Sequence, residues 1–310
     1  NNNVKIHHGI NFTSLMKAIK NDVEIENEKK AYIKDGVALV KFFYWVETGA
    51  GTGTITEQVA VEKLHRFREE LPDFIEDSFD AIIGYGANAA IVHHNPMTSK
   101  TPTRIETSGL LLVDSGGHYL QGTTDTTRTY AMGPTTYEEN RDYTLVLKSH
   151  IAGMMARFPS GTRGSYVDAL AKQPLYNEFL NYNHGTGHGV GHMLCVHEGP
   201  QGIRYNNDVE LVPGMMTSME PGLYITNRHG IRIESITLCV ESEKNEFGQF
   251  LEFESLTWAP LDTRPVLIEM MTKKELDWLN QYNKTCYEKL SPYLSGEELK
   301  YLEERCQAIG

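Results

Sequence analysis

The spacing of apolar residues predicts two helices near the start of the chain. Across residues 24–47 these residues recur every three to four positions, which is the period of one face of a helix, and Gly49 follows. A second helix is expected at 57–70, because Thr54 with Glu57 three positions later has the form of a capping box. Two helices followed by strand-like segments indicate an α+β protein.

Short apolar runs separated by glycine turns come next and are typical of strands. Strands are expected at 81–83, 89–92 and 109–114. Residues 122–130 are rich in β-branched side chains and predict a hairpin partner for 109–114.

Capping boxes predict three further helices. Thr136 with Glu139 opens the first of them, which reaches about residue 158. A shorter helix without a capping box is expected to follow near 167–180. In the last part of the chain, two more capping boxes open helices, at Thr272 with Glu275 and at Ser295 with Glu298.

Residues 184–191, His-Gly-Thr-Gly-His-Gly-Val-Gly, are predicted to be extended. Each of the four glycines would cost a helix about 1 kcal/mol relative to alanine. His184 and His188 are four positions apart, as in helical zinc proteases, but no glutamate follows the first histidine. In an extended segment, glycines let a ligand or another backbone approach closely.

The same order of elements occurs in two segments. A strand that ends in an acid is followed by a glycine turn and by a second, answering strand, which pairs with the first and carries another acid. Asp114 and Asp125 are the acids of the first segment, and Glu220 and Glu234 are those of the second, with 230–235 as its answering strand. This weak internal duplication predicts two related halves that face each other across one site.

The charge and composition of the chain argue against some classes of binding partner. The net charge of −12 argues against nucleic acid or an anionic membrane as the main partner. No apolar run reaches the roughly 18 residues that span a bilayer. The cysteines have no CxxC spacing and indicate reduced thiols in a cytoplasmic protein: Cys195, Cys239, Cys286 and Cys306. Because the chain begins Asn-Asn-Asn, we expect a fragment of a longer protein.

One histidine and four acids form a candidate metal site: Asp114, Asp125, His188, Glu220 and Glu234. Taken singly, each acid is more often an ordinary turn carboxylate. Four carboxylates buried together would raise one another's pKa, and two divalent ions would remove that conflict. The donor set favours Mn²⁺, with Co²⁺, Fe²⁺ or Zn²⁺ as alternatives, over Ca²⁺. Ions about 3.5–4 Å apart can hold a bridging water or hydroxide as nucleophile.

These motifs resemble the five metal segments of the pita-bread metallopeptidases, which include aminopeptidase P, prolidase and methionine aminopeptidase. The segments are Val113–Gly116, Thr124–Thr129, His184–Gly191, Met219–Gly222 and Arg232–Glu234. The likeness covers roughly residues 20–262. The tail, with Trp278–Asn283 and Leu290–Leu294, is similar to the C-terminal extension of the long, three-domain cytosolic aminopeptidase P.

The resemblance implies an α+β pita-bread (creatinase/aminopeptidase) fold with pseudo-twofold duplicated halves and a small helical C-terminal extension. Residues 1–20 would be a linker or the remnant of a missing preceding domain. Residues 21–262 would form the catalytic domain, and 263–310 the extension. The full-length protein would be a homodimer.

The resemblance also implies a role for each metal-site residue. Asp114 would chelate one ion, and Asp125 and Glu234 would bridge both. His188 and Glu220 would complete the coordination of the second ion, and Glu220 would also act as general base for the bridging water.

Further histidines and one arginine surround that predicted site. The family has three further histidines beside its metal ligands, which donate to the substrate carbonyl oxygen and transfer protons, and they match His93, His184 and His197. His94 stands where the family has tyrosine. His192 has no family role and is expected to be structural. Arg232 shares a strand face with Glu234, which favours a substrate-orienting cation or a plain salt bridge.

The sequence therefore predicts a dimetal aminopeptidase that removes an N-terminal residue preceding proline. Ligand spacing alone indicates only a dimetal hydrolase, and the proline preference comes from the resemblance. A prolidase, which cuts Xaa-Pro dipeptides, is the nearest alternative. Methionine aminopeptidase is less favoured because it lacks such a tail. A metal-free pita-bread binding module, or a hydrolase that uses no metal, is a further alternative.

Overall fold

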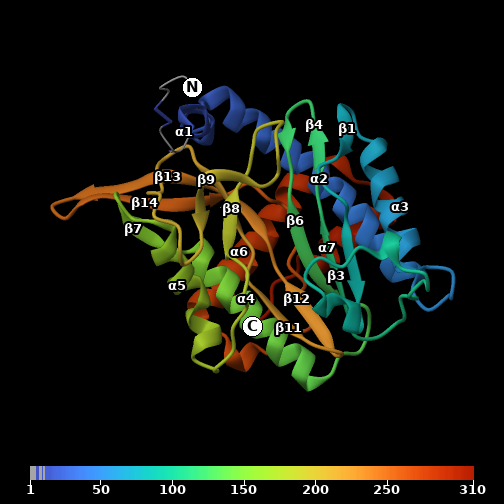
Figure 1. Ribbon diagram of the computed structural model, residues 1–310. Helices are drawn as coiled ribbons and strands as arrows, with labels where there is room; N and C mark the ends of the chain where they lie inside the picture. The colour runs from blue at the N-terminus through green and yellow to red at the C-terminus, as the bar shows by residue number, and fades with distance from the viewer. Residues whose placement is uncertain (1–4, 7–8, 10) are drawn as a thin grey trace.

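The computed structural model describes residues 5–6, 9 and 11–310. Strands run through the middle of the molecule in Figure 1, with α2 (Asp22–Gly49) and α3 (Glu57–Glu69) on one side. On the other side lie α4 (Tyr137–Met154) and α5 (Gly164–Tyr176), and the C-terminal helices lie behind the strands. The chain is thus α+β, as the sequence predicts.

The two N-terminal helices are confirmed, but the capping box expected at the second one is wrong. Thr56 caps α3 by accepting from the Val59 amide, while the Thr54 hydroxyl is 2.8 Å from that of Thr52. The reason lies in the backbone, because the Glu57 amide donates to the Thr103 carbonyl at 3.0 Å. This pairing keeps the chain extended as far as Thr56.

Two outer strand pairs confirm the duplicated halves. In the first half, β3 (Leu110–Ser115) pairs antiparallel with β6 (Thr126–Ala131). In the second half, β10 (Met216–Met219) pairs antiparallel with β13 (Ser235–Asn245). The two acids of each half therefore come together at the end of one strand pair.

An inner hairpin follows the first strand in each half. It is formed by β4 (Gly117–Tyr119) and β5 (Gly122–Thr123) in one half, and by β11 (Gly222–Ile225) and β12 (His229–Arg232) in the other. The single answering strand expected at 230–235 is therefore wrong. It is divided, because β12 pairs with β11 whereas the chain from Ser235 pairs with β10.

The strand expected at 89–92 is also wrong. After β2 (Ile82–Tyr85) the chain forms a 3-10 helix, η1 (Gly86–Ala90). Ala89 packs so closely on β12 that a Cβ on Gly230 would lie 1.8 Å from the Ala89 carbonyl oxygen. This short helix covers β12 instead of adding a strand, and it buries Ala89 but leaves Ile91 exposed.

The remaining strands complete the sheets. Three strands, β2, β3 and β6, form one small sheet, and β1 (Phe74–Asp77) joins β4 and β5 in another. The largest sheet has the order β7-β14-β13-β10-β8-β9. Its further members are β7 (Arg157–Pro159), β8 (Gly187–Gly189), β9 (Glu198–Ile203) and β14 (Gly248–Ser255).

The prediction of an extended glycine-histidine segment is confirmed by β8. This strand lies so close to β10 that a Cβ on Gly187 would be 1.9 Å from the Ser218 carbonyl oxygen. Only glycine fits there.

Both middle helices end earlier than their apolar patterns predict. The first, α4, ends at Met154 because the chain then forms β7, in which Phe158 pairs with Leu251 of β14. The second, α5, ends at Tyr176, and Phe179 has a left-handed backbone with a φ of 57°.

The C-terminal helices α6 (Lys273–Leu290) and α7 (Gly296–Arg305) bridge the two halves. Leu290 and Leu302 join the core of α2 and α3, whereas Leu279 joins the core around α4. Short 3-10 helices complete the fold: η2 (Pro96–Thr98), η3 (Ile268–Met270) and η4 (Ser291–Tyr293).

The first 20 residues were expected to be a linker or a domain remnant, and residues 1–4, 7–8 and 10 of that stretch lie outside the described residues. Its later part forms α1 (Phe12–Ala18). Lys17 and Lys20 both pair with Glu198 of β9, at 2.7 and 3.1 Å. The division into residues 1–20, 21–262 and 263–310 stays a prediction.

Among the described residues, no helix has the length and apolar character needed to cross a bilayer.

The two C-terminal caps differ and give a paired stability test. The capping box at Thr272 is complete, but the one expected at Ser295 is wrong, since that side chain makes no cap hydrogen bond. Thr272→Ala should lower the free energy of unfolding by about 1 kcal/mol, the usual loss for an N-cap. Ser295→Ala is the control, with a much smaller expected change in urea denaturation. Equal losses would contradict this account of the caps.

Candidate metal centre

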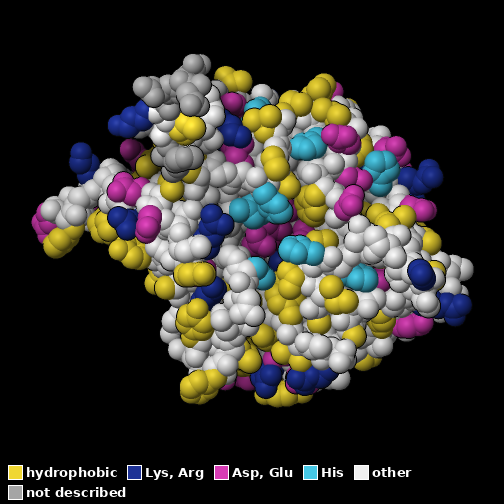
Figure 2. All heavy atoms as spheres, in the orientation of Figure 1, with side chains coloured by type: hydrophobic (Ala, Val, Ile, Leu, Met, Phe, Trp, Pro, Cys, Tyr) yellow, Lys and Arg dark blue, Asp and Glu magenta, His cyan; other side chains and the backbone are white. Residues whose placement is uncertain are grey.

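A cavity of about 570 Å³ opens between the two halves. Histidine side chains surround a hollow with acidic side chains at its base (Figure 2). The cavity is lined by every site residue expected from the sequence: His93, Asp114, Asp125, His184, His188, His197, Glu220, Arg232 and Glu234.

The strand pairs explain why four acids distant in sequence meet. Asp114 lies in β3 and Asp125 directly precedes β6, whereas Glu220 directly follows β10 and Glu234 directly precedes β13. The halves are joined here because the Glu234 amide donates to the Thr127 carbonyl at 3.0 Å. The Thr127 hydroxyl also donates to Glu234 Oε2 at 2.8 Å.

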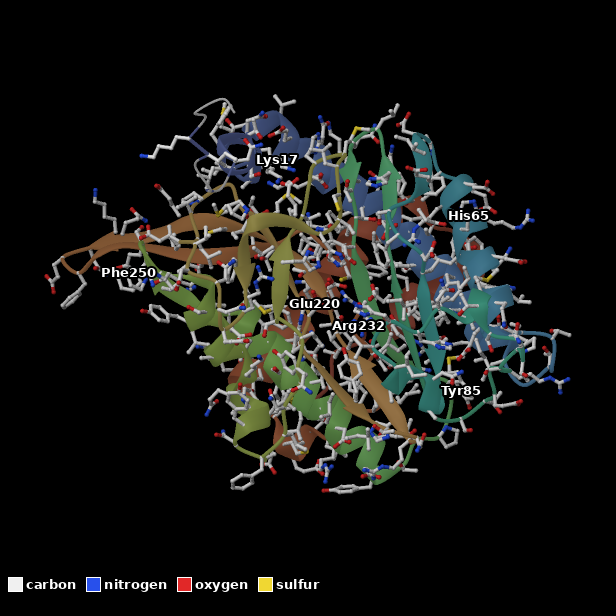
Figure 3. The ribbon with its side chains drawn as sticks, in the orientation of Figure 1. Lys17, His65, Tyr85, Glu220, Arg232 and Phe250 are labelled. Carbon is white, nitrogen blue, oxygen red and sulfur yellow. The ribbon has the colours of Figure 1, made fainter. Side chains whose placement is uncertain are left out.

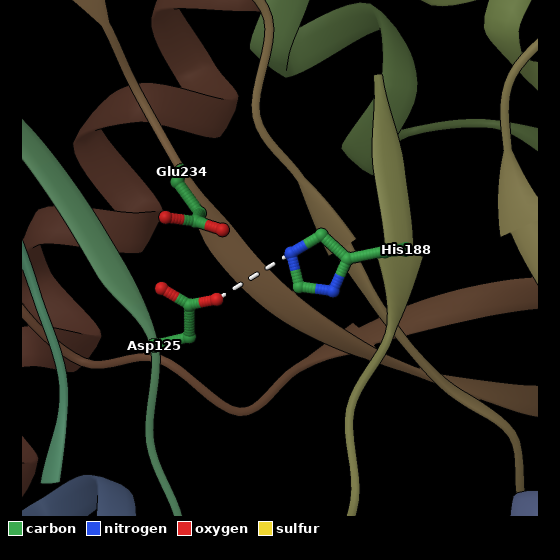
Figure 4. A group of neighbouring side chains, drawn as sticks. All are labelled: Asp125, His188 and Glu234. Atoms are coloured by element: carbon green, nitrogen blue, oxygen red, sulfur yellow. Dashed lines mark ion pairs between the residues drawn. The ribbon is translucent and has the colours of Figure 1, made fainter. Parts of the chain in front are cut away.

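Three of the five expected ligands approach within coordination range of one another. One ligand atom each from Asp125, His188 and Glu234 lies within 4.8 Å of the others (Figure 4). His188 Nε2 is 3.5 Å from Asp125 Oδ2 and 3.3 Å from Glu220 Oε1. The imidazole thus faces carboxylates of both halves.

Hydrogen bonds orient the His188 ring for metal binding. Its Nδ1 lies 2.9 Å from the Gly189 carbonyl oxygen, an acceptor, so Nδ1 carries the proton. The unprotonated Nε2 then points at the carboxylates, which is the usual arrangement of a metal-ligating histidine. Burial lowers the pKa of His188 and favours this neutral form.

The carboxylates of the site repel one another, which raises their pKa values. Burial, followed by repulsion from neighbouring acids, raises the pKa of Asp125 and Glu234 well above the ordinary range. Burial raises the pKa of Glu220 to about 8, against the opposing charge of Arg232. In the metal-free cavity these groups therefore hold protons that divalent cations could replace.

Asp114 combines an ion pair with a free oxygen. Arg232 Nη2 donates to Asp114 Oδ2 at 2.5 Å, the salt bridge that was one interpretation of this arginine. Asp114 Oδ1 is buried and has no hydrogen-bond partner among the described residues. Such an orphaned carboxylate oxygen beside three further acids fits a cation. Figure 3 shows Glu220 and Arg232 near the middle of the molecule.

The outer histidines occupy distinct environments. His184 Nε2 accepts from the Tyr224 hydroxyl at 2.9 Å, and burial lowers the pKa of this histidine to about 4. The His197 ring stands perpendicular to that of His188, with 4.4 Å between centroids. His93 lines the cavity, but His94 Nε2 lies 3.0 Å from Glu57 Oε2. This contact gives His94 a structural partner.

Sequence reasoning missed several residues that line the cavity or support its lining residues. Tyr224 accepts from Arg232 Nη1 at 2.9 Å and reaches His184, while the Ser218 hydroxyl donates to Glu220 Oε1 at 3.0 Å. Thr127 lies two positions after Asp125, so strand alternation could have indicated it. The unpredicted residues that line the cavity are Phe79, Asp80, Ile82, Val92, Asn95 and Arg204, whereas Gly185 and Gly187, which also line it, belong to the predicted glycine-histidine segment.

Comparisons with protein families agree with this geometry. Residues 26–241 match the model of metallopeptidase family M24, and residues 249–309 match that of the C-terminal region of the same peptidases.

Known relatives cover nearly the whole chain. A protein named probable Xaa-Pro aminopeptidase P from Laccaria bicolor is 43% identical over 95% of this chain and 47% of its own length. Aminopeptidase P1 of Arabidopsis thaliana is 36% identical over 96% of this chain and 50% of its own. The chain therefore spans about half the length of these relatives.

Solved structures of similar proteins include peptidases that act next to proline. The X-prolyl aminopeptidase of Caenorhabditis elegans, described as a cytosolic enzyme with a di-nuclear active site, superposes with a TM-score of 0.92 at 36% identity. That match covers 96% of this chain and 50% of the other. An Xaa-Pro dipeptidase from Bacillus anthracis reaches 0.68 at 27% identity, over 81% and 64%.

The raised carboxyl pKa values predict a pH-dependent response to metal. Between about pH 4.5 and 8 the folded metal-free chain holds more protons than the unfolded chain, so its stability should fall as pH rises. Bound Mn²⁺ replaces those protons. The increase in melting temperature that Mn²⁺ produces should therefore grow from pH 5 to pH 8. Calorimetry checks this, and an increase that is independent of pH would contradict it.

Proposed function

Since the chain belongs to metallopeptidase family M24, we propose that it carries the active site of an Xaa-Pro aminopeptidase, which hydrolyses the bond between an N-terminal residue and a following proline. The observation that carries this proposal is the fit to the C. elegans X-prolyl aminopeptidase, which extends through the C-terminal helices. The dipeptidase superposes less completely, with a TM-score of 0.68.

We assign the metal roles by the resemblance to the family's five metal segments, and the lining of one cavity by all five residues supports the assignment. Asp114 would hold one ion, His188 and Glu220 the other, and Asp125 with Glu234 both. The unpartnered Asp114 oxygen and the unprotonated Nε2 of His188 support this set. One imidazole and four carboxylates suit Mn²⁺, with Co²⁺, Fe²⁺ or Zn²⁺ as alternatives.

A pair of divalent ions would supply Lewis acidity toward the peptide carbonyl and toward water. Glu220 would take a proton from the attacking water and return it to the leaving proline nitrogen. It lies on the cavity wall, oriented by the Ser218 hydroxyl.

Histidines beside the metal ligands would stabilise charge on the substrate carbonyl. His197 and His93, both on the cavity wall, are placed to donate hydrogen bonds as negative charge develops on the oxygen. His184 accepts from Tyr224, so its role would be to hold that hydroxyl beside Arg232. Arg232 would keep Asp114 in place and orient substrate.

We also propose the substrates, the cellular location and the oligomeric state. Peptides with proline at position two would be the substrates, and the full-length protein would be a cytoplasmic homodimer, with weaker activity in this portion alone. The C. elegans structure is described as cytosolic. A metal-free binding module is disfavoured, because the clustered buried acids would then lack compensating charge.

Hydrolysis of a tripeptide compared with that of a dipeptide distinguishes the proposed aminopeptidase from a prolidase. With Mn²⁺ the purified protein should release arginine from Arg-Pro-Pro much faster than from Arg-Pro, measured by amino-acid analysis. Turnover of the dipeptide alone would favour a prolidase and contradict the proposal.

Glu220→Gln serves as the control variant. It keeps the shape of the side chain but removes the base, so hydrolysis should fall at least about a hundredfold, the lower end of the range for general-base catalysis. Its circular dichroism spectrum should stay that of the wild type. Undiminished hydrolysis would place the base on another residue.

A further inference from the structure

A carboxylate–histidine pair outside the cavity connects α2 to the loop that joins two of the site histidines. Loop 190–197 runs from β8, which carries His188, to His197 at the start of β9. Its middle residues, Met193, Leu194 and Cys195, are exposed. His192 is the side chain of this middle part that reaches inward.

His192 contacts a fully buried acid of α2. Its Nδ1 lies 2.9 Å from Glu28 Oε1, and the side chain of Glu28 has no exposed surface. The hydrogen bond to Glu28 raises the pKa of His192. Glu28 Oε2 is buried and has no hydrogen-bond partner among the described residues. The His192 contact is therefore a large part of what compensates this carboxylate.

The same acid also fixes the strand that leads to Asp125. The Thr123 amide donates to Glu28 Oε1 at 3.2 Å, and the Thr123 hydroxyl donates to the Leu194 carbonyl at 3.1 Å. The fit is close, because a Cβ on Gly122 would lie 2.4 Å from the Glu28 carboxyl group. One carboxylate thus joins α2, β5 and loop 190–197.

Both ends of the loop are already fixed. His188 lies in β8, and Glu198 is held by Lys17 and Lys20. Between these ends the loop is attached by two contacts, that of Leu194 with Thr123 and that of His192 with Glu28. Both contacts lie between the glycine segment and His197 along the chain.

From these contacts we propose that Glu28 and His192 are positioning residues, which set the location of His197 and of Asp125 for catalysis. The inference rests on the proposed aminopeptidase function. Neither residue lines the cavity, so they act through the loop and through Thr123. The effect should therefore fall on kcat more than on KM.

Kinetics of three variants test the contact. His192→Ala and Glu28→Ala should each lower kcat for Arg-Pro-Pro about tenfold, a moderate loss for a displaced catalytic group, with KM changed less than about twofold. His192→Asn keeps a donor in place of Nδ1 and should retain most of the wild-type kcat. Equal losses in the alanine and asparagine variants would contradict a role for the hydrogen bond.

A matched control removes a similar contact elsewhere. His65 Nδ1 lies 2.7 Å from Asp77 Oδ2, and neither residue lines the cavity. His65→Ala should leave kcat unchanged. A loss equal to that of His192→Ala would show a general effect on the fold and overturn the proposal.

A double-mutant cycle tests whether His192 acts through His197. If it does, His192→Ala should lower kcat far less in the His197→Ala background than in the wild type. Additive losses would overturn that part of the proposal.

Hydrogen exchange tests the attachment without any need for turnover. In His192→Ala the amides of 191–198 and 122–126 should exchange at least tenfold faster, while those of α6 stay unchanged. Unchanged exchange in both segments would overturn the proposal. An inactive wild-type protein would instead contradict the proposed function, and the exchange data would still decide on the attachment.

Discussion

Repulsion among four buried carboxylates is the constraint on which the rest of this structure depends. Burial and mutual repulsion raise the pKa of Asp125 and Glu234, so the cavity is unfavourable for charged acids without cations. Arg232 compensates Asp114 alone through a direct ion pair, and it leaves Asp114 Oδ1 without a partner. The unfavourable burial of these carboxylates creates a site where divalent cations can replace protons.

The scaffold resists that repulsion by joining the two halves behind the acids. Arg128, which is 1% exposed, donates to the Ala259 carbonyl at 3.0 Å and to the Tyr282 hydroxyl at 2.7 Å. It also donates to the Glu234 carbonyl. One guanidinium thus connects β6, the strand end at Glu234 and α6. The C-terminal helices are therefore part of the support of the site, and they lie in the segment that matches the C-terminal region of the M24 peptidases.

Sequence reasoning reached the site more completely than it reached the fold. The five expected ligands were found because their chemistry is costly to bury together, and all five line one cavity. The roles assigned to them stay predictions. Local rules failed where tertiary contacts decide: the chain at 86–90 forms a 3-10 helix against β12 instead of a strand at 89–92, and the cap of α3 is Thr56 instead of Thr54. Tyr224 was missed because its partners, His184 and Arg232, are distant in sequence.

The metal content of the protein tests the central claim most directly. After dialysis against Mn²⁺ and removal of free ions, elemental analysis should find two ions per chain. Asp125→Asn with Glu234→Gln, which removes both proposed bridging carboxylates, should retain fewer than one. Wild-type protein that binds no divalent ion at neutral pH, or a double variant that still holds two, would contradict the account.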